Sequence, residues 1–84
     1  MLFDVKVQVE LKNGVLDTAG KAVSKSLTAQ GFNHVERSIR IGKTIRLQIE
    51  ALSKAEAAKE VEKMCEALFA NAVIEQYEFS LEEV

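Results

Sequence analysis

The chain has 84 residues, of which 48 % are hydrophobic and 29 % are charged, with a formal net charge of −2 and a pI of about 5.4. This length predicts one domain, residues 1–84, whose core is marginal unless the chain associates with something else. The acidic balance argues against nucleic acid as a partner, because a phosphate backbone normally meets a basic face.

The first part of the chain predicts a strand followed by a helix. Apolar and polar residues alternate from Phe3 to Leu11, which indicates a strand with one buried face. Asn13-Gly14 interrupts this pattern. Apolar positions then recur at helical spacing from Ala19 to Leu27, and Gly31 is well placed to end the helix in the left-handed conformation.

Two further strands are expected after this helix. The second strand covers roughly Val35 to Ile41, Gly42-Lys43 forms a tight turn, and the third strand covers Thr44 to Glu50. In the third strand the isoleucine and leucine side chains point inward and the charged ones point outward.

A second helix and a last strand complete the prediction. Ser53 and Glu56 have the spacing of a capping box. The helix that they open is expected to end near Asn71, and Ala72 to Phe79 is the expected last strand. The apolar stripe of this helix comprises Ala57, Ala58, Val61, Met64, Cys65 and Leu68.

The element order strand-helix-strand-strand-helix-strand is typical of an α+β, ferredoxin-like βαββαβ fold. We therefore expect a four-stranded antiparallel sheet with two helices on one face. The other face stays open and carries polar side chains, such as Lys6 and Arg46, rather than the aromatic platform that an RNA-binding sheet needs.

The stretch KNGVLDTAGKAV, residues 12–23, comes close to a phosphate-binding loop. That loop needs four residues between its glycines and a Ser or Thr after its lysine. Here five residues separate Gly14 from Gly20, Ala22 replaces the hydroxyl, and Asp17 is negative. The sequence instead favours Asp17 as the N-cap of the first helix, Gly14 in a turn, and Gly20 at a close approach of packed groups or of a partner.

No catalytic, cofactor-binding or metal-binding residue is predicted. His34 has no companion at metal-ligand spacing, and Cys65 lies within an apolar stripe, as a buried structural cysteine does. The lone cysteine cannot form an intrachain disulfide, so a reducing cytoplasm is expected.

Residues 1–10 alternate in polarity, and we expect neither a signal peptide nor a membrane anchor there. The one basic cluster is either a solvated face or a contact for an acidic partner, and comprises Arg37, Arg40, Lys43 and Arg46.

Four blocks of sequence resemble the PurS family, the small subunit of phosphoribosylformylglycinamidine synthase. They are KNGVLDTAGKAV, QGFNHVE, RIGKTIRLQIE and CEALFANAVIEQYEF, and the resemblance runs from about Val5 to Phe79. Thr18 and Ala72 stand where the family usually has proline. Thr18 would be the first helical residue, where proline is favoured but replaceable.

The resemblance implies a subunit without catalytic residues of its own. Such a subunit joins a large synthetase subunit and a glutaminase subunit, which convert formylglycinamide ribonucleotide, ATP and glutamine into formylglycinamidine ribonucleotide in purine biosynthesis. It bridges the two and supports ammonia transfer, while ATP and Mg belong to the synthetase. The resemblance also implies a homodimer or a dimer of dimers.

Two segments are expected to contact partners, the loop from Gly14 to Gly20 and the turn from Ile41 to Thr44. Exposed glycine allows close backbone approach, although packing inside the chain explains the same residues equally well. The alternative function is a stand-alone regulatory module that binds a small ligand at a dimer interface. The candidate interface residues are Gly14, Asp17, Gly20, Arg40, Gly42 and Lys43.

Overall fold

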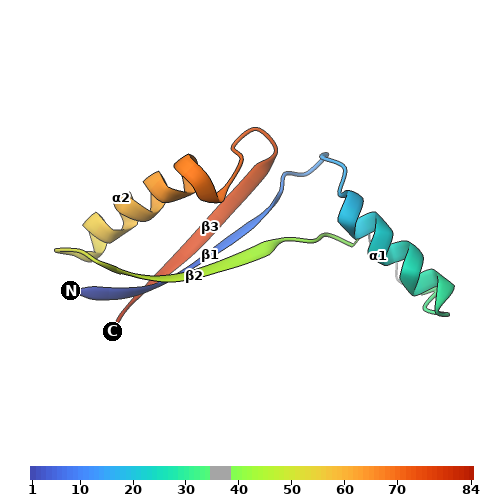
Figure 1. The fold of residues 1–84 in the computed structure, drawn as a ribbon, viewed down its shortest axis with the longest axis horizontal. Coiled ribbons are helices and arrows are strands. Elements are labelled where there is room, and N and C mark those ends of the chain that lie inside the picture. The colour runs from blue at the N-terminus through green and yellow to red at the C-terminus, as the bar shows by residue number, and fades with distance from the viewer. Residues whose placement is uncertain (35–38) are drawn as a thin grey trace.

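The computed structural model describes residues 1–34 and 39–84, which form an α+β arrangement of two α-helices and a three-stranded sheet (Figure 1). Neither helix of this described part combines the length and the hydropathy needed to cross a membrane. The elements in chain order are β1 (Leu2–Leu11), α1 (Thr18–Ala29), β2 (Lys43–Glu50), α2 (Lys54–Met64), the π-helical turn η1 (Cys65–Phe69) and β3 (Glu75–Glu83).

The sheet is antiparallel, with β1 in the middle, β2 on one side and β3 on the other. Val7 lies opposite Ile45 on β2 and opposite Phe79 on β3. Because side chains directly opposite each other share a face, the apolar residues of all three strands gather on one face of the sheet. The alternation predicted for β1 and β2 is therefore confirmed, and each strand begins one residue earlier than expected.

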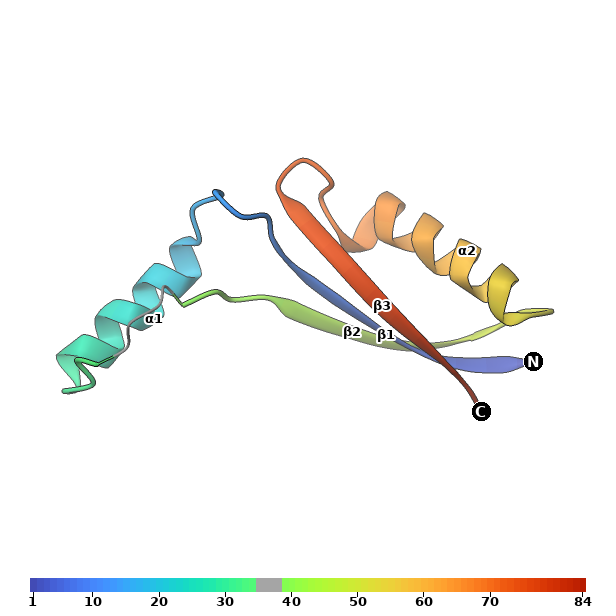
Figure 2. The same ribbon diagram turned by 180° about the vertical axis from the view of Figure 1, so that it is seen from behind.

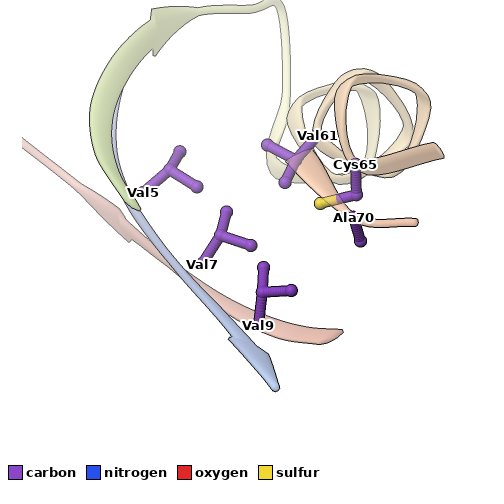
Figure 3. Close-up of a cluster of buried hydrophobic side chains, with 6 residues drawn as sticks. All are labelled: Val5, Val7, Val9, Val61, Cys65 and Ala70. Carbon is purple, nitrogen blue, oxygen red and sulfur yellow. The ribbon is translucent and has the colours of Figure 1, made fainter. Parts of the chain in front are cut away.

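The core lies between the apolar face of the sheet and α2 with η1. The side chains of Val5, Val7 and Val9 on β1 point toward Val61, Cys65 and Ala70 (Figure 3). Cys65 is buried as predicted, and this burial raises the pKa of its thiol. The predicted cap of α2 is also present, because the N–H of Glu56 donates to Ser53 Oγ at 3.2 Å.

The apolar stripe predicted for the second helix is wrong at Leu68, which is 80 % exposed. The cause is η1, where the N–H of Ala70 donates to the carbonyl of Cys65, five residues earlier, at 3.0 Å. A π-helical turn holds an extra residue, so side chains after Cys65 rotate relative to α-helical spacing. Phe69 consequently packs against the core in the place expected for Leu68.

The last strand begins at Glu75 and ends at Glu83, not at Ala72 and Phe79 as predicted. A turn at Asn71 delays its start, because Asn71 Oδ1 accepts from the N–H of Val73 at 3.0 Å and the Asn71 carbonyl accepts from the N–H of Glu75 at 2.7 Å. The strand extends further because β1 offers pairing partners as far as Phe3, opposite Glu83.

Helix α1 does not cover the sheet, contrary to the expectation of two helices on one face. Both views show α1 projecting away from the end of the sheet, while α2 lies over it (Figures 1 and 2). The predicted strand Val35–Ile41 falls partly on residues 35–38, which lie outside the described residues, and residues 39–41 are not in a strand. Lys43 opens β2 instead of closing a tight turn. The described residues thus contain three strands, not four.

Candidate functional site at the start of helix α1

Asp17 joins the start of α1 to the segment that leads into β2. Its Oδ1 accepts from the N–H of Gly20 at 2.7 Å, and its Oδ2 accepts from the N–H of Ile41 at 2.7 Å. The predicted N-cap is therefore confirmed, and the second oxygen adds a contact between residues 24 positions apart. Gly14, in the loop before Asp17, has a φ of 88°, which suits the turn predicted there.

The environment of Asp17 favours its charged form. The N–H of Ile41 and the N–H of Gly20 both donate to the carboxylate and lower the pKa of Asp17, and the positive charge of Arg40 acts in the same direction. Asp17 is only 7 % exposed, so these donors replace much of the water that would otherwise solvate the carboxylate.

Arg40 also links the segment before β2 to the end of β1 and to the loop before α1. Its guanidinium donates to the carbonyl oxygens of Leu11, Lys12 and Val15, each at 3.1 Å. Arg40 is exposed, as expected for a solvated face, and it also holds the end of β1 against the segment before β2. Contact with an acidic partner stays a prediction.

The glycines of the site allow close approach within the chain. A β-carbon on Gly20 would overlap the carbonyl oxygen of Ile39, and a β-carbon on Gly42 would lie 2.7 Å from the carbonyl oxygen of Val9. A larger residue at position 20 would therefore push the start of α1 away from the segment before β2, and one at position 42 would push that segment away from β1. Packing within the chain accounts for both glycines, as the sequence had left open.

The structure brings four of the six candidate interface residues together around one surface hollow of about 460 Å³. Gly42 and Lys43 line a separate, smaller hollow beside Val9 and Glu10. Lys43 is exposed, and Arg37 of the predicted basic cluster lies outside the described residues. A role in subunit contact stays a prediction for all six. The four residues of the larger hollow are Gly14, Asp17, Gly20 and Arg40.

The chemistry of this hollow is poorly suited to phosphate. The N–H of Gly20, which a phosphate at the helix start would need, already donates to Asp17, and the Asp17 carboxylate would repel the anion. In residues 1–34 and 39–84 no three His, Cys, Asp or Glu side chains are grouped so that they could hold a metal ion. His34 is exposed. The arrangement instead sets the direction in which α1 leaves the sheet.

Lys12 takes part in this region but was not singled out from the sequence. Its Nζ donates to the carbonyl of Ala72 at 2.7 Å, and its N–H donates to the carbonyl of Ile74 at 2.9 Å. It thereby joins the loop before α1 to the turn before β3. A lysine at the end of an amphipathic strand carries no sequence signal for such a contact, because its usual position is solvated.

Comparison with known proteins identifies the family. The family model PurS, described as phosphoribosylformylglycinamidine (FGAM) synthase, matches residues 4–83. The PurS subunit of phosphoribosylformylglycinamidine synthase from Bacillus subtilis is 45 % identical over 83 residues, which cover 99 % of this chain and 96 % of that protein.

Two solved structures agree with this match over nearly the full length of both chains. PurS of Methanocaldococcus jannaschii, a subunit of formylglycinamide ribonucleotide amidotransferase, superposes with a TM-score of 0.84 at 34 % identity, covering 98 % of each chain. A chain of the PurLQS structure from Thermotoga maritima superposes with a TM-score of 0.86 at 33 % identity, covering 98 % of this chain and 99 % of that one. This chain therefore belongs to the PurS family of phosphoribosylformylglycinamidine synthase subunits.

Proposed function

We propose that this chain is a non-catalytic bridge between the synthetase and glutaminase subunits of phosphoribosylformylglycinamidine synthase, and that it supports ammonia transfer between them. Membership of the PurS family makes it the small subunit of this enzyme of purine biosynthesis. The observation that carries the proposal is the match, along almost its whole length, to a chain of the PurLQS complex.

Three of the described side chains that can act in catalysis are engaged within the chain, which supports a role without catalysis. Asp17 accepts two backbone N–H groups, Cys65 is buried, and Tyr77 donates to Glu66 at 2.9 Å. A catalytic nucleophile needs a base within hydrogen-bond reach and access to substrate. We therefore assign ATP and Mg to the synthetase partner and no cofactor to this chain, and we place the complex in the cytoplasm, where a free thiol such as Cys65 is stable.

We propose further that the chain works as a homodimer, alone or within a dimer of dimers. Its radius of gyration is 16.6 Å, whereas a compact domain of this length has about 12 Å. Its accessible surface of 6308 Å² exceeds by roughly 1,300 Å² the value of about 5,000 Å² that is typical of a monomer of this mass. Each partner in a standard interface buries about 800 Å², so the excess is large enough for a stable contact. The ferredoxin-like arrangement of four strands and two helices is proposed only for this assembled state.

Reconstitution of the enzyme tests the bridging role. The synthetase and glutaminase partners are purified, and product formation is measured with glutamine and with ammonia as the nitrogen source, with and without this chain. We expect omission to reduce the glutamine-dependent rate much more than the ammonia-dependent rate, because ammonia added to the solution does not need a bridge. Equal glutamine-dependent rates with and without the chain would contradict the proposal.

A further inference from the structure

We infer that Asn13 is a site of spontaneous deamidation, and that the isoaspartate formed there weakens the hydrogen bonds of Arg40 to the loop before α1. The inference does not depend on the function proposed above. Three observations support it: the residue that follows Asn13, the free groups of the turn in which the two residues lie, and the position of Arg40 around that turn.

Asn13 and Gly14 are the two central residues of an exposed turn between β1 and α1 (Figure 1). The N–H of Val15 donates to the carbonyl of Lys12 at 3.1 Å and closes the turn. Gly14 has a φ of 88°, which is typical of glycine in the third position of such a turn. Among the described residues, no atom beyond its two chain neighbours lies within 4 Å of the point where a β-carbon would stand. The turn is therefore open to water beside Gly14.

The groups that must react are not engaged elsewhere in the described part of the chain. Within residues 1–34 and 39–84, neither the side chain of Asn13 nor the N–H of Gly14 takes part in a hydrogen bond. The amide of Asn13 is thus free to turn toward the nitrogen of Gly14, and Gly14 has no side chain to crowd that nitrogen. Attack within one chain is fast where the reacting groups are neighbours that can reach the required geometry.

The reaction needs water and neither an enzyme nor a cofactor. The backbone nitrogen of Gly14 attacks Cγ of Asn13; the N–Cγ bond forms, the Cγ–Nδ2 bond breaks, and Nδ2 leaves as ammonia with the proton of the Gly14 N–H. Water then opens the resulting succinimide. Attack of water at Cγ gives aspartate, whereas attack at the backbone carbonyl of Asn13 gives isoaspartate, in which the main chain runs through Cβ and Cγ. Both products carry a negative charge in place of the neutral amide.

The other two asparagines of the sequence lack this combination. Asn71 is exposed but precedes an alanine, whose β-carbon crowds the attacking nitrogen, and its Oδ1 accepts from the N–H of Val73 at 3.0 Å. Asn33 is also exposed but precedes His34, whose side chain crowds the nitrogen in the same way. Exposure alone therefore does not distinguish the three residues; the following glycine and the free amide single out Asn13.

Arg40 makes the geometry of this turn important for α1. Its guanidinium donates to the carbonyl of Lys12 on one side of the turn and to the carbonyl of Val15 on the other side, each at 3.1 Å. Isoaspartate adds a carbon atom to the main chain between these two carbonyls, so one planar guanidinium can no longer bind both of them in the same geometry. The modification thereby loosens the loop before α1, whose start Asp17 ties to the same segment.

Incubation of the purified full-length chain at mildly alkaline pH, well below its unfolding temperature, tests the site. Peptide mass spectrometry measures the conversion of each asparagine, and methylation by protein isoaspartyl methyltransferase measures the isoaspartate. We expect Asn13 to convert at least roughly tenfold faster than Asn33 or Asn71, a difference of about 1.4 kcal/mol in the barrier. The rate should rise with pH, because the attacking nitrogen must lose its proton. Equal conversion of the three asparagines would overturn the inference.

Two variants serve as matched controls. Asn13→Gln keeps an amide but lengthens the side chain, so the ring that must close is larger, and isoaspartate at this position should disappear. Ala72→Gly places a glycine after Asn71, whose amide stays bound to the N–H of Val73. Asn71 should still convert more slowly than Asn13 in this variant. Equal rates there would contradict the role assigned to the free amide of Asn13.

Modification in two backgrounds tests the link to Arg40. The isoaspartyl form of the wild-type chain is isolated by chromatography, and its midpoint of thermal unfolding, measured by circular dichroism, should lie roughly 4 °C below that of the fresh chain. Arg40 is exposed, so Arg40→Ala leaves the core intact, and in this variant the same modification should lower the midpoint much less. Equal losses in both backgrounds would overturn the link to Arg40, and an unconverted Asn13 in the wild type would overturn the whole inference.

Discussion

At the scale of single residues, Asp17 has a larger structural role than an ordinary N-cap. A typical cap satisfies one N–H at the start of a helix, whereas Asp17 also accepts the N–H of Ile41. Removing its carboxylate leaves both the Gly20 and Ile41 N–H groups without their acceptor. The direction of α1 therefore depends on this one side chain together with Arg40.

We predict that Asp17→Ala lowers the midpoint of thermal unfolding by roughly 4 to 8 °C, as loss of a cap does in a domain of this size. Asp17→Asn should have a smaller effect, because its amide oxygen can still accept one N–H. Circular dichroism at one fixed protein concentration measures the midpoint of thermal unfolding of the wild type and of both variants. Midpoints that match the wild type for Asp17→Ala would show that the two contacts do not stabilise the chain.

The pKa of Asp17 predicts how this difference depends on pH. The pKa is lower in the folded chain than its ordinary value of 3.8, so the carboxylate stabilises the fold fully above that value and stops doing so as the pH falls through the folded pKa. The difference in stability between wild type and Asp17→Ala should therefore shrink below about pH 4. Urea denaturation over a series of acidic pH values measures it, and a difference that grows toward acid would contradict the assignment.

Tyr77 offers a separate residue-level test because it is the only tyrosine in the sequence. Its hydroxyl donates to Glu66, and this hydrogen bond, with burial and the nearby negative charge, raises the pKa of Tyr77 to about 12. The absorbance of the phenolate in alkaline titration measures this pKa. Glu66→Gln should lower it toward the ordinary value of 10. An unchanged midpoint in the Glu66→Gln variant would rule out the proposed cause.

At the scale of elements, the sequence predicted the strands of the described part, both helices, and the caps at Asp17 and Ser53, because these follow from local spacing. It could not predict η1, since Val61, Cys65 and Leu68 continue an α-helical stripe without a break. Whether Leu68 or Phe69 enters the core is decided by packing against the sheet, which no local pattern encodes. A close approach at Gly20 was predicted, either of packed groups or of a partner, but the sequence did not identify Ile39 as the residue that it meets.

The π-helical turn predicts that two neighbouring substitutions destabilise the chain to very different extents. Phe69→Ala should lower the free energy of unfolding by about 2 kcal/mol, because Phe69 packs against the core. Leu68→Ala should change it by less than about 0.5 kcal/mol, because Leu68 is exposed. Urea denaturation of both variants gives the comparison. The reverse order is what an uninterrupted α-helix would produce, and would show that η1 is absent in solution.

At the scale of the whole molecule, the position of α1 is the feature that the sequence did not predict. Its amphipathic pattern suggested packing on its own sheet, but the links from Asp17 to Ile41 and from Arg40 to Leu11 hold its start at the end of that sheet. Helical spacing says that a helix has an apolar face and does not say which chain covers it. For the same reason, the sequence could suggest that six residues contact another subunit but could not say which subunit each of them contacts.

The account depends on this chain being incomplete until a second copy covers the apolar surface that it exposes. Sedimentation equilibrium of the purified full-length chain at micromolar concentration tests this most directly, since it measures mass without assuming a shape. We predict a mass of at least twice the 9.3 kDa of one chain. A mass of 9.3 kDa under these conditions would contradict it.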